Sequence, residues 1–287
     1  MSFNAKSIRV FAPATVSNVG PGFDLLGFAL NEPGDEVILR INDTKQVQIS
    51  KITGDKGLLP YEVHKNTASV AVMSMLKSLN MDIGLELEIH KKMGLGSGLG
   101  SSAASAVASV FALNNLLDSP LEKEELLKYA LDGEQIASQD IHADNTAPCL
   151  YGGFTLICSY NPLDIINIPY PKELYCTVIY PQVEIKTSEA RKLLGTEIPI
   201  KKSVEQMGNF GGLLVGIMQN DLELIKRSLK DIIVEPVRAK LIPGYYGIKN
   251  AALEEGALGC SISGSGPAIF ALAESKDHAG KISGSMK

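Results

Sequence analysis

The sequence contains no clusters of cysteine or histidine of the kind that zinc sites and disulfide frameworks require. No two cysteines form a Cys-x-x-Cys pair, and the 4 histidines are equally scattered. The cysteines are Cys149, Cys158, Cys176 and Cys260. We therefore expect buried free thiols, and neither a zinc site nor a disulfide.

Long apolar runs and an excess of positive charge are also missing. No stretch approaches the roughly 20 apolar residues of a membrane-spanning helix, and residues 1–14 lack the basic-then-apolar pattern of a signal peptide. The net charge of −5 argues against a nucleic-acid or membrane-surface partner. We expect a cytoplasmic globular protein with a small-molecule partner.

Hydrophobic periodicity predicts a mixture of strands and helices. Alternation at period two predicts strands at 7–12, 36–41, 47–52 and 85–91. Further strands are expected at 154–158, 174–180, 259–263 and 268–273. Three-and-four spacing of apolar residues predicts helices at 67–79, 101–117 and 121–137. Further helices are expected at 188–194, 203–219, 222–229, 246–255 and 276–287. This order is typical of an α+β fold.

The length of 287 residues suggests about two domains. Glycines at 152 and 153 and a proline-rich stretch at 161–171 favour a boundary between 1–160 and 161–287. The terminal helix has no strand after it, so we expect the last element of the second domain to be missing.

Glycine recurs at every second position from Gly94 to Gly100, directly before a helix of small residues. Glycine lets backbone N–H groups turn toward one point, where the helix dipole adds positive charge. The loop thus favours a polyphosphate, although hairpins and helix starts also collect glycine for conformational reasons. It is not a Walker A loop, because Ser101 and Ser102 follow Gly100 with no lysine.

Several segments together carry a family resemblance. PATVSNVGPGFD at 13–24, GSGLGSS at 96–102 and SISGSGP at 261–267 resemble, in order, the motifs of the GHMP kinases. HADN at 142–145, TSEAR at 187–191 and EPVR at 235–238 resemble the homoserine kinases within that family. The match runs from residue 8 to residue 273. Gly94 departs from it, because the family usually has proline there.

The resemblance implies a two-domain GHMP kinase fold. The N-terminal domain would resemble the second domain of ribosomal protein S5, and the C-terminal domain would be ferredoxin-like, with ATP and substrate between them. The implied reaction moves the γ-phosphoryl group of ATP, with Mg²⁺, to the side-chain hydroxyl of L-homoserine on the route to threonine. A homodimer is left open.

The resemblance also implies which residues bind the nucleotide and the metal. The nucleotide would contact Asn66 and the loop Lys92, Met93, Gly94, Leu95, Gly96, Ser97, Gly98, Leu99, Gly100, Ser101 and Ser102. Ser102 and Glu134 would hold Mg²⁺, which prefers hard oxygen ligands. Without the resemblance, Asn66 and Ser102 read as helix N-caps and Glu134 as part of a solvated helix face.

By the same resemblance, Arg191 and Arg238 bind the homoserine carboxylate, while Asp24 and Asn18 bind its ammonium group. We expect Arg191 in the first turn of a helix, where its charge opposes the dipole and so points to a functional role. The alternative for Arg238 is a surface ion pair with Glu235.

The reacting hydroxyl would be surrounded by His142, Asp144 and Asn145, which we expect in a loop after the helix of Glu134. Asp144 is the general base by residue type, although a loose transition state requires little activation of the nucleophile. His142 could also be a satisfied core histidine, and Asp144 a turn former.

Two further residues have a structural alternative. Thr187 would place its hydroxyl near the transferred group or act as an N-cap. Gly264 would lie against the substrate or simply shape a hairpin.

Two other functions remain open. A GHMP kinase for mevalonate or a sugar would share the motifs but would have no use for the paired arginines. A non-catalytic ligand-binding member would be expected to lose Ser102, Glu134 or Asp144, all of which this chain keeps.

Overall fold

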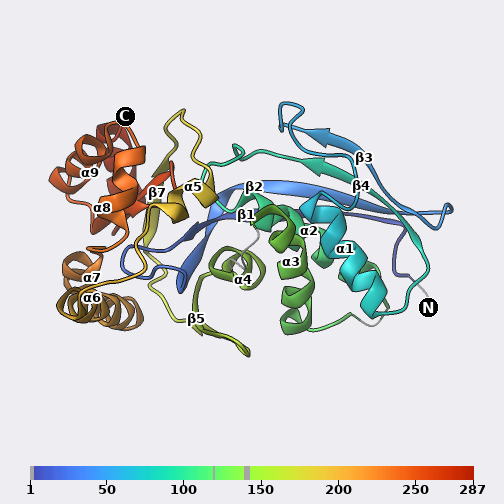
Figure 1. Cartoon of the computed structure of the whole chain (residues 1–287), viewed down its shortest axis with the longest axis horizontal. Coiled ribbons are helices and arrows are strands. Elements are labelled where there is room, and N and C mark those ends of the chain that lie inside the picture. The colour runs from blue at the N-terminus through green and yellow to red at the C-terminus, as the bar shows by residue number, and fades with distance from the viewer. Residues whose placement is uncertain (1–2, 119, 139–142) are drawn as a thin grey trace. The chain divides into compact units, whose positions relative to one another are not determined.

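The computed structural model describes residues 3–118, 120–138 and 143–287 (Figure 1). Contacts divide the chain into two compact units that are both discontinuous in sequence. The first comprises Met1–Thr15, Ala29–Leu95 and Gly100–Gly152, and the second Val16–Phe28, Gly96–Leu99 and Gly153–Lys287. These units are groups of residues in mutual contact; the division into domains at residue 160 stays a prediction.

The first unit contains a sheet and a group of helices. Its strands are β1 (Ser7–Ser17), β2 (Leu26–Asn42), β3 (Val47–Thr53) and β4 (Gly84–His90), of which β1 and β2 also contribute residues to the second unit. Within the first unit, β4 pairs antiparallel with β2 and parallel with β3. A Cβ at Gly34 on β2 would collide with the carbonyl oxygen of Ala12 on β1, so glycine is required at this close approach.

Alternation along β4 separates an apolar face from a charged one. Leu85, Leu87 and Ile89 are buried, whereas Glu86 and Glu88 point to the opposite face. There they form ion pairs with Arg40 at 3.3 and 2.5 Å.

The helices of the first unit are α1 (Thr67–Ser78), α2 (Ser101–Leu116), α3 (Lys123–Ser138) and α4 (Ala143–Tyr151). The first three pack against one another (Figure 1). Alanine and serine dominate α2, which is buried on almost every side. Gly133 on α3 is required for close packing, because a Cβ there would lie 2.5 Å from the carbonyl oxygen of Thr67.

The second unit contains two groups of strands. Strand β5 (Phe154–Tyr160) pairs antiparallel with β6 (Leu163–Ile168) and with Leu26–Phe28 of β2. Strands β7 (Tyr175–Ile179), β8 (Gly259–Ile262) and β9 (Ile269–Ala273) form an antiparallel sheet in the order β7-β9-β8.

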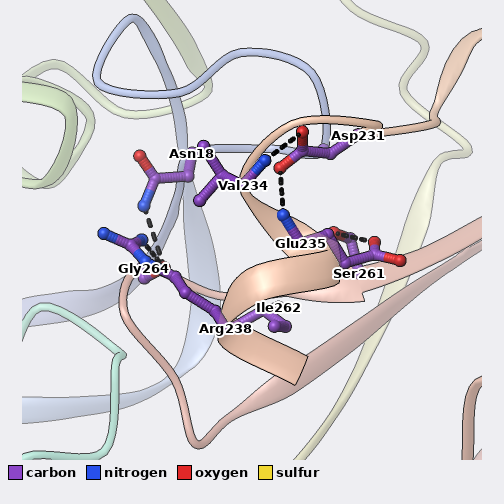
Figure 2. A pocket seen from close by; sticks show the side chains of 9 residues that line it. Asn18, Asp231, Val234, Glu235, Arg238, Ser261, Ile262 and Gly264 are labelled. Carbon is purple, nitrogen blue, oxygen red and sulfur yellow. Dashed lines mark hydrogen bonds between the residues drawn. The ribbon is translucent and has the colours of Figure 1, made fainter. Parts of the chain in front are cut away.

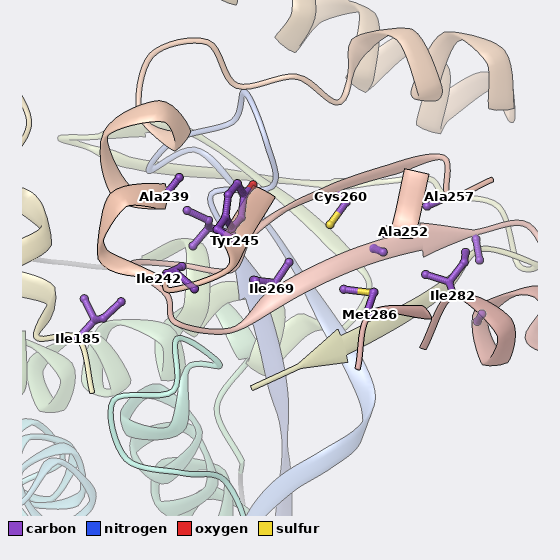
Figure 3. Close-up of a cluster of buried hydrophobic side chains, with 14 of the residues drawn as sticks. Ile185, Ala239, Ile242, Tyr245, Ala252, Ala257, Cys260, Ile269, Ile282 and Met286 are labelled. Atoms are coloured by element: carbon purple, nitrogen blue, oxygen red, sulfur yellow. The ribbon is translucent and has the colours of Figure 1, made fainter. Parts of the chain in front are cut away.

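The second unit also contains several helices. They are α5 (Thr187–Lys192), α6 (Ile200–Gln219), α7 (Leu222–Ser228), α8 (Glu235–Arg238), the 3-10 helix η1 (Ala239–Leu241), α9 (Tyr245–Glu254) and α10 (Lys276–Ser285). Helix α9 packs on β8, and α10 packs on β7 and β9. Figure 3 shows the resulting core, in which Tyr245 of α9, Ile269 of β9 and Ile282 of α10 are at most 1% exposed.

The elements agree with the expected mixed α+β architecture. Cys149 and Cys260 are buried, Cys176 is partly buried and Cys158 is exposed, so the expectation of buried thiols fails at Cys158. Among residues 3–118, 120–138 and 143–287, no helix has the length and apolar character needed to span a bilayer.

Candidate functional site

The start of α2 lies in the first unit, where Gly100 is the N-cap residue. Gly100 has a φ of 68°, and a Cβ there would meet Thr15 Oγ1 and approach Asn145 Oδ1 to 2.8 Å. Its lack of a side chain means that it cannot cap the helix by a side-chain hydrogen bond. The first N–H groups of α2 therefore present the positive end of the helix dipole without such a cap.

The middle of the glycine-rich loop belongs to the second unit. Gly98 has a φ of 80°, and a Cβ there would lie 2.5 Å from the carbonyl oxygen of Ser263. Ser263 Oγ donates to the Gly98 carbonyl at 2.6 Å, and the N–H of Ala268 donates to the Ser97 carbonyl at 3.0 Å. Glycine thus serves both backbone conformation and close approach here, and the loop is held against the turn between β8 and β9.

Ser102 and Glu134 meet in the first unit. Ser102 Oγ donates to Glu134 Oε1 at 2.8 Å, and Glu134 is only 5% exposed. Burial raises the pKa of Glu134 to about 7, and the nearby Asp144 carboxylate adds to the effect, whereas the Ser102 hydrogen bond and the Lys91 ammonium oppose it. A solvated Glu134 is wrong, because its side chain is buried. A Ser102 N-cap is also wrong, because Gly100 is the N-cap of α2.

A buried ion pair near this site was not predicted from the sequence. Lys91 and Asp35 form an ion pair with side chains 2% and 0% exposed. Lys91 Nζ also donates to the Ser101 carbonyl at 2.6 Å and to Ser105 Oγ at 2.7 Å. Burial lowers the pKa of Lys91, and the Asp35 carboxylate opposes this. The available signal was that Lys91 continues the alternation of buried residues along β4.

Asp35 binds residues at the beginning and at the end of the glycine-rich loop, and these residues lie in the first unit. It accepts the N–H groups of Lys92 at 2.7 Å and Met93 at 3.1 Å, and the hydroxyl of Ser101 at 2.7 Å. The exposed ammonium of Lys92 binds Glu36 at 2.6 Å. The ion pair therefore fixes the backbone on either side of the loop.

Asn66 is the N-cap of α1, as one interpretation of the sequence had it. Its side chain accepts the N–H of Ala68 at 3.1 Å and donates to the Pro60 carbonyl at 3.0 Å. Its contact with a nucleotide stays a prediction.

Asp144 and Asn145 lie in the first turn of α4, so their expected placement in a loop is wrong. An acidic residue is favourable there because of the helix dipole. Asp144 is 2% exposed, and Asn145 Oδ1 accepts the hydroxyl of Thr15 at 2.8 Å. His142 lies outside the described residues.

Asp24 and Arg191 form a bidentate ion pair in the second unit, with both N–O distances at 3.0 Å. The backbone N–H of Asp24 donates to Asn18 Oδ1 at 2.8 Å, and both residues adopt positive φ. Arg191 lies in the last turn of α5, not the first, because this helix ends at Lys192. A cation is favourable in the last turn, so the position of Arg191 in the helix does not by itself indicate a functional role.

Asn18 and Arg238 converge on one carbonyl group, as Figure 2 shows. Asn18 Nδ2 and Arg238 Nη1 donate to the Gly264 oxygen at 2.9 and 2.8 Å. Gly264, with a φ of 59°, lies in the turn between β8 and β9, so it does shape a hairpin. Its N–H donates to the carbonyl of Ser17 at 3.1 Å.

The alternative of a surface ion pair between Arg238 and Glu235 is wrong, because the two residues are 2% and 6% exposed. Glu235 instead binds Lys249 at 2.5 Å and the hydroxyl of Ser261 at 2.8 Å.

A pocket opens beside Arg238 (Figure 2). Its lining residues are Asn18, Gly20, Asp231, Val234, Glu235, Arg238, Ser261, Ile262 and Gly264. Asp231 accepts the N–H groups of Val234 and Glu235 at 2.9 and 2.8 Å and so fixes the start of α8. Asn18, Arg238 and Gly264 were predicted from the sequence, and the other lining residues were not.

Thr187 is the first residue of α5, and Lys186 is the N-cap, so the N-cap interpretation of Thr187 is wrong. Its Oγ1 lies 3.2 Å from Ser265 Oγ. Ser265 is a polar residue of the β8–β9 turn that the sequence did not single out.

Comparison with known proteins decides the family. The family model for the GHMP kinases N terminal domain matches residues 66–153, and that for the GHMP kinases C terminal domain matches residues 213–287. The homoserine kinase of Chloroherpeton thalassium is 50% identical, covering 98% of this chain and 92% of its own length. The chain belongs to the homoserine kinase family. It is accordingly an enzyme, a kinase of the GHMP group.

Solved structures of homoserine kinases agree with this. The crystal structure of homoserine kinase from Cytophaga hutchinsonii has a TM-score of 0.97 and 54% identity, covering all of this chain and 91% of its own. The expected two-domain GHMP kinase fold is thereby confirmed. Mevalonate kinase from L. major, with a TM-score of 0.77 and 20% identity, shares the fold alone.

Proposed function

We propose that this chain transfers the γ-phosphoryl group of ATP to the side-chain hydroxyl of L-homoserine, giving ADP and O-phospho-L-homoserine. The support comes from curated homoserine kinases that cover nearly the whole chain at up to 50% identity. The observation that carries the proposal is the group of Asn18, Asp24, Arg191 and Arg238 in the second unit. It places fixed charges of both signs together, as an amino-acid substrate requires.

The Asp24–Arg191 pair suits a zwitterion. The guanidinium group of Arg191 donates two hydrogen bonds of 3.0 Å to the carboxylate of Asp24. A bound amino acid would bring its carboxylate to Arg191 and its ammonium group to Asp24, so both charges would keep a partner of opposite sign. Arg238 would provide the second cation for the carboxylate, and Asn18 a further polar contact for the ammonium group.

We propose that Asn66 and the loop from Lys92 to Ser102 bind ATP. The left-handed glycines and the N-terminus of α2 provide backbone N–H groups for phosphate oxygens. The Asp35–Lys91 pair supports this role indirectly, since it holds Lys92, Met93 and Ser101 in place.

Ser102 and Glu134 fit a magnesium ion. Both offer hard oxygen atoms, and they are already 2.8 Å apart. A cation beside Glu134 would also relieve the cost of a carboxylate that is buried and close to Asp144. Bound Mg²⁺ would supply positive charge against the phosphate oxygens.

We propose that Asp144 accepts the proton of the homoserine hydroxyl. At the same time, the hydroxyl oxygen forms a bond to the γ-phosphorus of ATP, while the bond between the γ-phosphorus and the bridging oxygen breaks and ADP leaves. Asn145 and Thr187 would orient the groups that react. Positioning is expected to supply much of the rate, because phosphoryl transfer proceeds through a loose transition state. The proposed contact of His142 with substrate rests on its place in the HADN segment.

With ATP and L-homoserine as substrates, we propose a cytoplasmic enzyme on the route to threonine. We also propose that the chain forms a homodimer.

The reaction is tested by following ADP release from Mg-ATP with L-homoserine, L-serine, mevalonate and galactose as separate acceptors. We expect L-homoserine to give the highest kcat/KM by at least tenfold. Preference for mevalonate or galactose would indicate another GHMP kinase, and equal background release with every acceptor would indicate a non-catalytic member.

A further inference from the structure

One aromatic ring lies against both arginines of the proposed substrate site. The Cζ atom of Arg191 is 5.5 Å from the centroid of the Phe23 ring, and that of Arg238 is 5.2 Å away. The two arginines come from different helices, α5 and α8. Both distances are within the range of cation–π attraction, which extends to about 6 Å from the centroid.

The backbone on both sides of this ring is held in place. On one side, the N–H of Asp24 donates to Asn18 Oδ1 at 2.8 Å. On the other, Gly22 packs so closely that a Cβ would lie 2.6 Å from the Cβ of Leu26 and 3.1 Å from the ring of Phe210. The direction in which Phe23 leaves the backbone is therefore fixed by its neighbours.

Two guanidinium groups near one ring repel each other, so their spacing needs support. Asp24 balances the charge of Arg191, and the Gly264 carbonyl accepts from Arg238. The negative face of an aromatic ring attracts both cations without hydrogen bonding to either. Phe23 can thus hold the two side chains while leaving their N–H groups directed to other partners.

We propose that Phe23 is a positioning residue that sets the spacing of Arg191 and Arg238 for a single carboxylate group of the acceptor. This inference rests on the proposed function, because it assigns the arginines to the homoserine carboxylate. Phe23 acts through the arginines and takes no part in the chemistry. Its loss should weaken use of homoserine and leave the binding of ATP unchanged.

The test compares Phe23→Leu and Phe23→Tyr with the wild type. Leucine keeps an apolar side chain without a π face, and tyrosine keeps the face. We expect Phe23→Leu to raise the KM for L-homoserine about tenfold. The substitution removes two cation–π contacts, with Arg191 and Arg238, and the loss of each should weaken binding about threefold. The KM for ATP should stay within twofold, and Phe23→Tyr should behave like the wild type. Phe11→Leu, at a ring that is 46% exposed on β1, is the matched control and should leave all constants unchanged.

A second measurement avoids the risk that Phe23→Leu fails to fold. Phenylalanine analogues with one, two and three ring fluorines at position 23 keep the ring shape and progressively weaken its negative face. We expect the KM for L-homoserine to rise stepwise along this series, while a flat series would overturn the inference. So would a Phe23→Leu variant that raises both KM values equally, or a Phe23→Tyr variant as impaired as Phe23→Leu. If the wild type itself does not phosphorylate homoserine, the proposed function fails as well.

Discussion

Replacing Glu134 by glutamine should make the metal-free protein more stable at alkaline pH. Burial raises the pKa of Glu134 from an ordinary 4.5 to about 7, and the difference corresponds to roughly 3 kcal/mol of preference for the neutral form. Because the folded value lies above the unfolded one, stability is lost as the pH rises from 4.5 to about 7, and then levels off. Glutamine removes this cost, and its amide oxygen can still accept the Ser102 hydroxyl.

The assay is urea unfolding with EDTA at pH 5 and pH 8. We expect the free energy of unfolding of Glu134→Gln to exceed that of the wild type by roughly 3 kcal/mol at pH 8 and by less than about 1 kcal/mol at pH 5. The exposed Glu205 on α6 provides the control, and Glu205→Gln should change stability by less than about 0.5 kcal/mol. Added Mg²⁺ should stabilise the wild type at pH 8 but not Glu134→Gln, which should also lose kinase activity. A Glu134→Gln variant no more stable than the wild type at pH 8, or a gain in stability independent of pH, would show that burial does not raise the pKa of Glu134.

Three further substitutions test other parts of the site. Asp144→Asn should lower kcat at least a hundredfold with little change in KM, since a general acid–base contributes about that factor; equal steady-state activity would remove Asp144 from the chemistry. Arg191→Ala should raise the KM for homoserine about a hundredfold, since a bidentate charged contact is lost, and leave calorimetric ATP binding unchanged; weakened ATP binding would contradict this assignment. Lys91→Met should lower the free energy of unfolding by about 3–5 kcal/mol, because it leaves Asp35 charged and buried; a urea midpoint like that of the wild type would show that the ion pair is not needed.

Regular periodicity predicted most of the fold. Helix α1 was expected at 67–79 and found at Thr67–Ser78, and α2 was expected at 101–117 and found at Ser101–Leu116. Both segments carry an uninterrupted pattern of apolar or small residues, which fits a helix. Local pattern was enough here because packing did not oppose it.

Pattern failed where tertiary contacts decide the structure. Strand β2 begins at Leu26 rather than near residue 36, since Pro33 and Gly34 interrupt the alternation although the strand continues. Strand β6 was missed inside a proline-rich stretch, where it lies between Pro162 and Pro169 and is supported by pairing with β5. Pairing with a neighbour supplies what the local sequence does not show.

In the candidate site, too, local motifs were predicted from the sequence and tertiary contacts were not. Ordered motifs identified the glycine-rich loop and both arginines, but no sequence spacing places Phe23 against Arg191 and Arg238, which are far apart in the chain. Lys91 resembles an exposed lysine until the burial of its strand neighbours is known. The roles of the motif residues in binding and catalysis stay predictions.

Identifying the reaction product tests whether the chain phosphorylates L-homoserine. We would incubate the chain with ATP, Mg²⁺ and L-homoserine and record ³¹P NMR spectra over time. We expect the γ-phosphate resonance of ATP to be replaced by that of a phosphomonoester matching authentic O-phospho-L-homoserine, in equal amount to the ADP formed. Release of inorganic phosphate alone, or an unchanged ATP spectrum, would contradict it.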